Sequence, residues 1–241
     1  SAYVFVRSGV TWTEQQILTA SDRAGGDVFG RALALDGSTL IVGAPKDELG
    51  SRANVGSAYV FTRSAGTWTE QQKLTPSNLT DRSEFAFSIS VDGNTAVFGA
   101  PGDSVGGNVR QGSAFVFTRS NGSWTQQQKL TSVDGASEDQ FGASVAIHGD
   151  TALIGARYDT VGTNVEQGSA YVFTRVGNSW IQQEKLTASD GAAGDVFGYS
   201  VALDDATAVV GAYRGDIGNN FEQGAAYVYV RSNGNWTQEE K

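Results

Sequence analysis

The chain has 241 residues, of which 26 are acidic and 17 are basic, and its formal net charge is −9. This balance argues against a protein that binds nucleic acid by neutralising phosphates, and no apolar run approaches the roughly 18 residues of a membrane span. Cysteine is absent, which excludes disulfides and thiolate metal sites. Methionine is absent as well, so we expect the chain to be processed or to be part of something longer.

One pentapeptide, Ser-Ala-Tyr-Val-Phe, recurs along the whole chain. It starts at residue 1 and returns, with small changes, at residues 57, 113, 169 and 225, which is a constant spacing of 56 residues. A fixed period of this size is typical of repeat architectures, in which each unit buries its apolar face against its neighbours.

Each repeat is predicted to form four strands, and residues 29–74 give the cleanest unit. Phe29 to Leu35 alternates and ends at the tight-turn pair Asp36-Gly37, and Thr39 to Ala44 is a short apolar run. Gly56 to Arg63 is rich in aromatic and β-branched residues, and Trp68 to Leu74 alternates with polar residues.

The predicted fold class is therefore all-β. Four-stranded antiparallel sheets repeated radially are the blades of a β-propeller, and no stretch has a convincing helical period. We expect one repeat domain over residues 1–241, with an orphan hairpin of strands 3 and 4 at 1–17 and four complete blades at 29–74, 85–130, 141–186 and 197–241.

Aligned columns support this interpretation. A phenylalanine opens strand 1 of every complete blade, at positions 29, 85, 141 and 197. The five tryptophans are spaced one per repeat, at positions 12, 68, 124, 180 and 236. Identical spacing is what packing between blades requires, and carbohydrate stacking is the alternative role.

These columns resemble a known repeat. Phe-Gly at residues 29–30, 141–142 and 197–198, followed by Gly-Ala-Pro at 43–45 and 99–101, is similar to the FG-GAP repeat of integrin α-subunit propellers and their bacterial relatives. The resemblance covers essentially the whole chain. It implies an extracellular or cell-surface propeller that is used for binding or adhesion.

The chain departs from that family at one place. Members often carry a calcium loop of Asp-x-Asp-x-Asp-Gly type between strands 1 and 2, because alternating oxygen ligands suit a hard cation. Here the connection is a tight turn, as at Asp36-Gly37 and Asp92-Gly93, which is too short to wrap an ion. The resemblance therefore carries over no calcium site, and whether Ca²⁺ binds elsewhere stays open.

The candidate binding face consists of the connections 2–3 and 4–1, which are long, acidic and rich in glycine. Loops on a rigid scaffold often carry function, whereas the alternative is a solvated rim whose aspartates satisfy turn backbones. The aspartates expected on this face are Asp22, Asp27, Asp47, Asp103, Asp134, Asp139, Asp159, Asp190, Asp195 and Asp216.

The ends of the chain suggest a second possibility, since there are five strand 3–4 hairpins but four strand 1–2 hairpins. The chain is an excerpt of a larger propeller, or its first hairpin helps to close the ring, or that hairpin docks on another copy to make a ring or fibre. The residues expected at such an assembly contact are Ser1, Tyr3, Phe5, Trp12, Tyr227, Tyr229 and Trp236.

Catalytic candidates are few. His148 is the sole histidine, and it occupies a turn position, so a Ser-His-Asp site has at most one candidate. No two carboxylates stand out as a glycosidase pair. The sequence therefore predicts a non-enzymatic propeller that binds a protein or glycan, or alternatively a structural subunit that binds copies of itself. A hydrolase is a third possibility.

Overall fold

The computed structural model describes residues 1–218 and 220–241 and contains eighteen strands in these residues. They form four antiparallel sheets of four strands and one two-stranded hairpin, which confirms the predicted all-β blades. The hairpin pairs β1 (Ala2–Ser8) with β2 (Thr11–Leu18). The sheets contain, in chain order, β3 (Leu33–Asp36), β4 (Thr39–Ala44), β5 (Ser57–Ser64) and β6 (Thr67–Leu74); β7 (Ser88–Asp92), β8 (Thr95–Ala100), β9 (Ser113–Ser120) and β10 (Ser123–Leu130); β11 (Phe141–His148), β12 (Thr151–Ala156), β13 (Ser169–Val176) and β14 (Ser179–Leu186); and β15 (Phe197–Asp204), β16 (Thr207–Ala212), β17 (Ala225–Ser232) and β18 (Asn235–Glu240).

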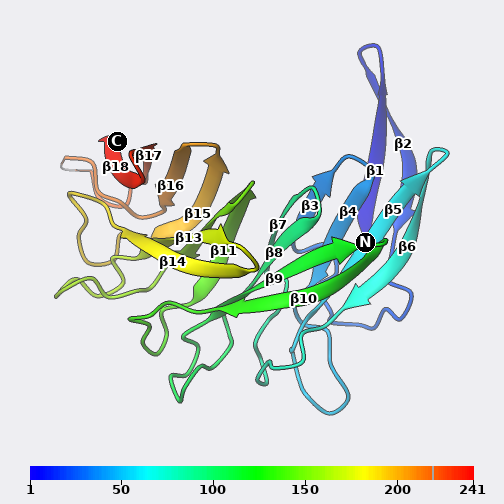
Figure 1. Cartoon of the computed structure of the whole chain (residues 1–241), viewed down its shortest axis with the longest axis horizontal. Coiled ribbons are helices and arrows are strands. Elements are labelled where there is room, and N and C mark those ends of the chain that lie inside the picture. Colours follow the sequence, from blue (N-terminus) through cyan, green and yellow to red (C-terminus); the bar gives the residue numbers. More distant parts are fainter. Residues whose placement is uncertain (219) are drawn as a thin grey trace.

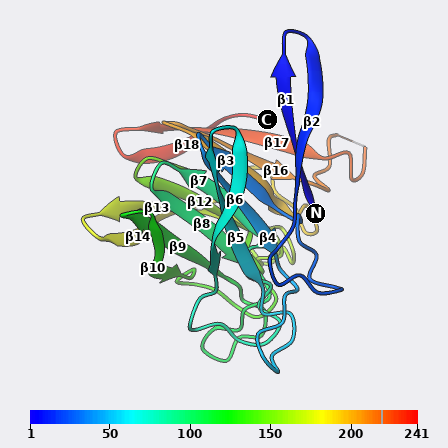
Figure 2. The same cartoon turned by 90° about the vertical axis from the view of Figure 1, so that its right-hand side faces the viewer.

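The sheets follow one another around an arc, with the inner strands β3, β7, β11 and β15 next to each other (Figure 1). The β1–β2 hairpin stands at one end of the arc and β18 at the other, as Figure 1 shows. Figure 2 shows the hairpin projecting beyond the sheets. In the described residues no strand of the hairpin pairs with the last sheet. The idea that the hairpin closes the ring is therefore wrong, because it packs on the sheet of β3–β6 instead.

The core lies between neighbouring sheets, where the repeated aromatic columns meet. Phe85 contacts Phe98, Phe115 and Phe117 with ring centroids 5.1 to 6.0 Å apart, and all four rings are buried. The same arrangement recurs one repeat later, where Phe141 packs edge-on against two aromatic rings. Edge-to-face contacts of this kind add to the free energy gained by burying the rings.

The glycine columns explain how one repeat joins the next. A Cβ on Gly99, in β8, would clash with the carbonyl oxygen of Gly142, at the start of β11. Gly112 has a φ of +87° and forms a parallel bridge to Phe141. The Gly-Ala segment of one sheet and the Phe-Gly segment of the next are thus two halves of one close backbone contact. That contact requires residues without a Cβ.

The first two sheets depart from the prediction at their inner strands. We expected strand 1 to open at Phe29, but β3 begins at Leu33 and β7 begins at Ser88. The φ of Gly30 is not the cause, because Gly142 has nearly the same value, +90° against +93°. The difference is one strand pairing: Phe141 pairs with Ala156, whereas the pairing of β3 with β4 begins only at Leu33. None of the described residues belongs to a helix of a length and apolarity that would cross a bilayer.

Candidate binding face

The long connections lie at the ends of the sheets opposite the tight turns (Figure 1). Those joining strands 2 and 3 span residues 45–56, 101–112, 157–168 and 213–224, and those joining strands 4 and 1 span residues 19–32, 75–87, 131–140 and 187–196. We call their combined surface the long-loop face. It carries all ten aspartates that the sequence singled out.

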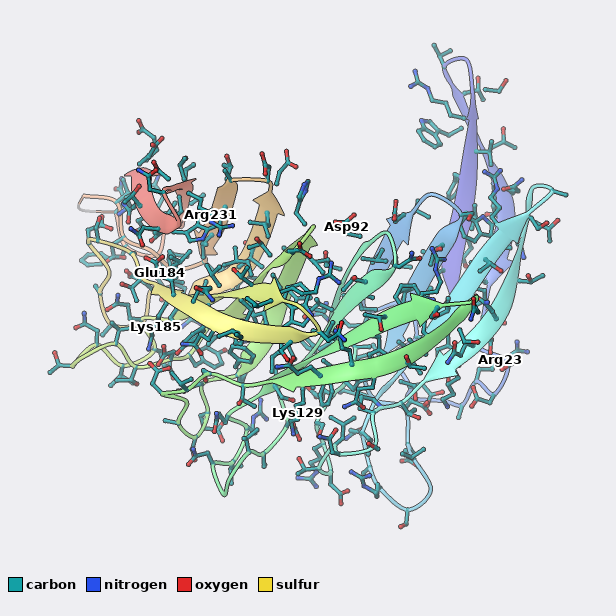
Figure 3. All side chains as sticks on the ribbon, viewed as in Figure 1. Arg23, Asp92, Lys129, Glu184, Lys185 and Arg231 are labelled. Atoms are coloured by element: carbon teal, nitrogen blue, oxygen red, sulfur yellow. The ribbon has the colours of Figure 1, made fainter. Side chains whose placement is uncertain are left out.

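The aspartates of the third sheet bind a lysine rather than pointing freely outward. Lys185, labelled in Figure 3, is on β14. Its Nζ lies 2.6 Å from Asp134 and 2.7 Å from Asp159. The hydroxyl of Tyr171 donates to both carboxylates, at 2.9 and 3.1 Å. Burial raises the pKa of Asp134, but the Lys185 and Tyr171 hydrogen bonds outweigh it and hold that pKa below its usual value. The network fastens a 2–3 loop to a 4–1 loop.

The first sheet repeats this network. Lys73 lies 2.7 Å from Asp22 and 2.6 Å from Asp47, and Tyr59 donates to both carboxylates. Ser57 also donates to Asp47. Desolvation lowers the pKa of Lys73, but the two carboxylates outweigh it and raise that pKa above its ordinary value. A shared geometry in two sheets indicates a structural role.

In the second sheet, the loop carboxylate is also bound by a lysine, but some of the other hydrogen-bond donors are different residues. Asp103 is fully buried, and its carboxylate lies 2.6 Å from the Nζ of Lys129. It also accepts hydrogen bonds from the hydroxyls of Ser113, Thr80 and Ser83. Burial alone would raise the pKa of Asp103, yet these bonds lower it below the usual value.

In the fourth sheet, the lysine and the tyrosine bind the carboxylate of the 4–1 loop, but in the described residues the 2–3 loop supplies no second carboxylate. Lys241 pairs with Asp190, and Tyr227 donates to the same carboxylate at 2.9 Å. The 56-residue period places Gly215, not Asp216, in the column of Asp47 and Asp159. The Asp216 carboxylate instead accepts the backbone N–H of Glu222, so it is not equivalent to the other loop aspartates.

A second column of aspartates caps turns. Asp27, Asp139 and Asp195 are buried and accept the backbone N–H of the residue three positions earlier, at 2.6 to 2.8 Å. Burial raises the pKa of Asp139 to about 6, helped by the charge of Asp159. The alternative interpretation, turn residues that satisfy backbone groups, describes this column best.

The carboxylates on this face are thus occupied by lysine, tyrosine, serine and backbone donors. Over residues 1–218 and 220–241, no three His, Cys, Asp or Glu side chains gather as a metal site would require. His148 is the last residue of β11, beside the tight turn rather than in it, and its Nδ1 lies 3.2 Å from Asp204.

The long-loop face also carries exposed apolar side chains, at loop positions other than those of the aspartates. Val109, Val165 and Phe221 occupy the same position of three successive 2–3 loops and are 56%, 60% and 84% exposed. The charge and glycine content that indicated this face in the sequence do not reveal these three apolar positions. Each loop is itself ordered by a short antiparallel bridge, such as Val105 to Asn108.

The expected assembly residues fall into two groups. Ser1, Tyr3, Phe5 and Trp12 are exposed on the hairpin, with Trp12 at 64%. Tyr227, Tyr229 and Trp236 are buried against the third sheet, so they are not available to another copy, contrary to expectation. A shallow hollow on the last sheet is lined instead by residues of β15, β16 and β17, including Tyr199 and Gly211.

The chain is similar in fold to a solved structure, that of the Pseudomonas aeruginosa periplasmic gluconolactonase PpgL. The TM-score is 0.57 at 13% identity, and the match covers 99% of this chain and 62% of that one. This chain therefore spans less than two thirds of its structural neighbour. A search of curated proteins found no match.

The likeness contradicts the expectation of a non-enzymatic protein, because a protein with the same fold is named as a gluconolactonase. Few histidines and repeated motifs were too weak a reason to exclude catalysis. At 13% identity the likeness shows the fold and assigns this chain no substrate.

The family is established by sequence. The model of the FG-GAP repeat matches residues 12–61, 68–117, 124–173 and 180–229. These four segments cover most of the chain, and their spacing is the 56-residue period itself. The Phe-Gly and Gly-Ala columns that define the repeat are the ones that meet between neighbouring sheets. The chain belongs to the FG-GAP repeat family.

Proposed function

We propose that this chain is a binding propeller that acts outside the cytoplasm and holds a protein or glycan partner on its long-loop face. The observation that carries the proposal is the row of exposed apolar loop tips at Val109, Val165 and Phe221. Exposed apolar groups on neighbouring loops are typical of interaction surfaces. The periplasmic location in the neighbour's name and the adhesive role of similar repeats support the setting.

The loop tips are held in place before any partner arrives. The carbonyl of Val109 accepts the backbone N–H of Glu138, and that of Val165 accepts the N–H of Gly194, both at 2.9 Å. The 2–3 loops of Val109 and Val165 are therefore tied to the 4–1 loops that follow them. A surface that is already ordered loses less conformational entropy on binding, which favours affinity.

The test compares two sets of exposed valines and aromatics. The triple variant V109S/V165S/F221S changes the loop tips, and the control V10S/V176S changes two exposed valines at the opposite ends of the sheets, one in a tight turn and one at the end of β13. Both would be screened with the parent chain on arrays of extracellular proteins and glycans. Binding that the triple variant loses and the control keeps supports the proposal. Binding that both variants keep, or no binding by the parent chain, refutes it.

The hairpin favours a second candidate function, contact between copies of the chain. Tyr3, Phe5 and Ile17 lie on one exposed side of the hairpin beside Trp12, and each is at least half exposed. Light scattering at micromolar concentration tests this. Large species that F5E/W12E abolishes support self-assembly, and a parent chain that stays monomeric refutes it.

A further inference from the structure

A pocket of about 390 Å³ lies where the innermost strands of the four sheets converge. Its lining includes Arg31, Phe87, Arg157 and Tyr199, each from a different repeat. Arg31, Phe87 and Arg157 lie where the long loops join β3, β7 and β12, and Tyr199 is the third residue of β15. The volume is within the range of roughly 300–1,000 Å³ that is common for small-molecule sites.

Two arginines and two aromatic rings share this pocket. The guanidinium carbon of Arg31 lies 4.1 Å from the centre of the Phe87 ring, and that of Arg157 lies 5.7 Å from the same centre. Arg157 also lies 5.8 Å from the ring centre of Tyr199. Cation–π contacts of this kind hold a guanidinium in place but leave its charge unneutralised.

Arg157 is positioned by a buried neutral side chain. Its Nε and one terminal nitrogen both donate to Oε1 of Gln140, at 2.9 and 2.6 Å, and Gln140 is 4% exposed. An amide oxygen orients the guanidinium without cancelling its charge. The remaining donors of Arg157 are free to bind a second acceptor.

In the part of the chain that the structure describes, neither Arg31 nor Arg157 forms an ion pair. Other arginines, Arg63 and Arg119 among them, also form no ion pair in the described residues, but this pocket brings two such guanidinium groups together. Lys73, Lys129 and Lys185, by contrast, each have a carboxylate within 2.7 Å. In a protein of net charge −9, two unpaired guanidiniums at one pocket indicate a site for an anion.

We propose that this axial pocket binds a small organic anion with a flat ring. A carboxylate of the ligand would accept hydrogen bonds from Arg31 and Arg157, because guanidinium groups match carboxylate geometry. The ring of the ligand would pack on the exposed parts of Phe87 and Tyr199. This site is separate from the loop-tip surface and does not depend on it.

Titration calorimetry with isophthalate, which carries two carboxylates on one ring, tests the proposal. Benzoate has one carboxylate and benzamide has none, so the expected order of affinity is isophthalate, then benzoate, with no saturable binding of benzamide. R31Q and R157Q should each weaken isophthalate binding about tenfold or more, since each removes charge-assisted hydrogen bonds. The control R63Q removes an exposed arginine on β5 that does not line the pocket, and it should bind like the parent chain.

A second measurement reports on the arginines directly. In the folded parent chain, the NMR signals of the Arg31 and Arg157 Nε–H groups should shift on addition of isophthalate, whereas that of Arg63 should not. The absence of saturable binding of isophthalate at millimolar concentration overturns the proposal. Equal binding of benzamide, or equal weakening by R63Q, overturns it as well.

Discussion

Gln72, in the outermost strand of the first sheet, holds both backbone groups of Trp124 in the next. Its Nε2 donates to the carbonyl of Trp124 at 2.8 Å, and its Oε1 accepts the Trp124 N–H at 2.9 Å. Gln16 binds Trp68 and Gln128 binds Trp180 in the same way. This amide clamp fixes the distance between the outer edges of neighbouring sheets.

Removing one clamp should weaken one junction. Gln72→Ala leaves two part-buried backbone groups of Trp124 without their partner, so we expect the free energy of unfolding to fall by about 1–3 kcal/mol. Urea denaturation measures the change, and hydrogen exchange of the Trp124 amide localises it. An unchanged unfolding curve with unchanged exchange would contradict the role of the clamp.

At the junction between the third and fourth sheets, a substitution can add the clamp instead of removing it. Glu184 takes the place of the glutamine there and accepts the N–H of Trp236 at 3.0 Å, but a carboxylate cannot donate to the carbonyl (Figure 3). Glu184→Gln restores the missing donor and should stabilise the chain by about 1 kcal/mol. Thermal unfolding of the two proteins at neutral pH checks it. A lower melting temperature for the variant would be inconsistent with this account.

The buried ion pair of the second sheet should be sensitive to the loss of its cation. Lys129→Met leaves the carboxylate of Asp103 buried and without its lysine, at an expected cost of about 3–5 kcal/mol. The double variant Lys129→Met/Asp103→Asn removes the charge and should recover part of that loss. Denaturant unfolding of the three proteins measures both effects. A double variant as unstable as Lys129→Met would argue against an electrostatic cause.

Asp139 should make stability depend on pH. Its pKa is raised by burial to about 6, so its protonated form favours folding below the ordinary carboxyl pKa, and this contribution is lost as the pH rises through 6. Asp139→Asn keeps an acceptor for the N–H of Ala136 but cannot ionise. The variant should gain stability relative to the parent chain at pH 7.5 and much less at pH 4. The melting temperatures of the two proteins between pH 4 and pH 7.5 test this. If the variant were stabilised equally at every pH, the raised pKa of Asp139 would not be the cause.

The close backbone contact between repeats predicts a strong effect of one methyl group. Gly99→Ala places a Cβ against the carbonyl of Gly142, and overpacking of this kind costs about 1–3 kcal/mol or more. Gly25→Ala is the matched control, because nothing lies within 4 Å of its Cβ position. Urea unfolding should show a loss for the first and little change for the second. Similar stabilities of the two variants would refute the contact argument.

Much of the fold could be predicted because every repeat packs against its neighbours with the same kinds of residue at the same positions. The apolar run of Thr39 to Ala44 and the tight turn at Asp36-Gly37 are local features, and a constant period places their equivalents in every sheet. The tryptophans at positions 68, 124, 180 and 236 are buried between sheets as the spacing indicated, whereas Trp12 is exposed because no earlier sheet covers it.

The roles of the charged residues could not be predicted in the same way. Asp134 and Lys185 are 51 positions apart, and the sequence does not say that the end of an outer strand meets a 4–1 loop there. The acidic face that composition suggested is therefore mostly neutralised by lysines and backbone donors. Asp216 differs from the other loop aspartates because it lies one residue beyond their column and therefore binds a different partner.

The sequence by itself determined the strands, the repeat and the family, since these depend on residue type and spacing along the chain. The tertiary structure alone decided which charges are paired and which are free. Arg31 and Arg157 are separated by more than two repeats, yet the convergence of the inner strands places both beside Phe87. Electrostatic partners depend on distance through space, and that distance is set by how the sheets fan around the centre.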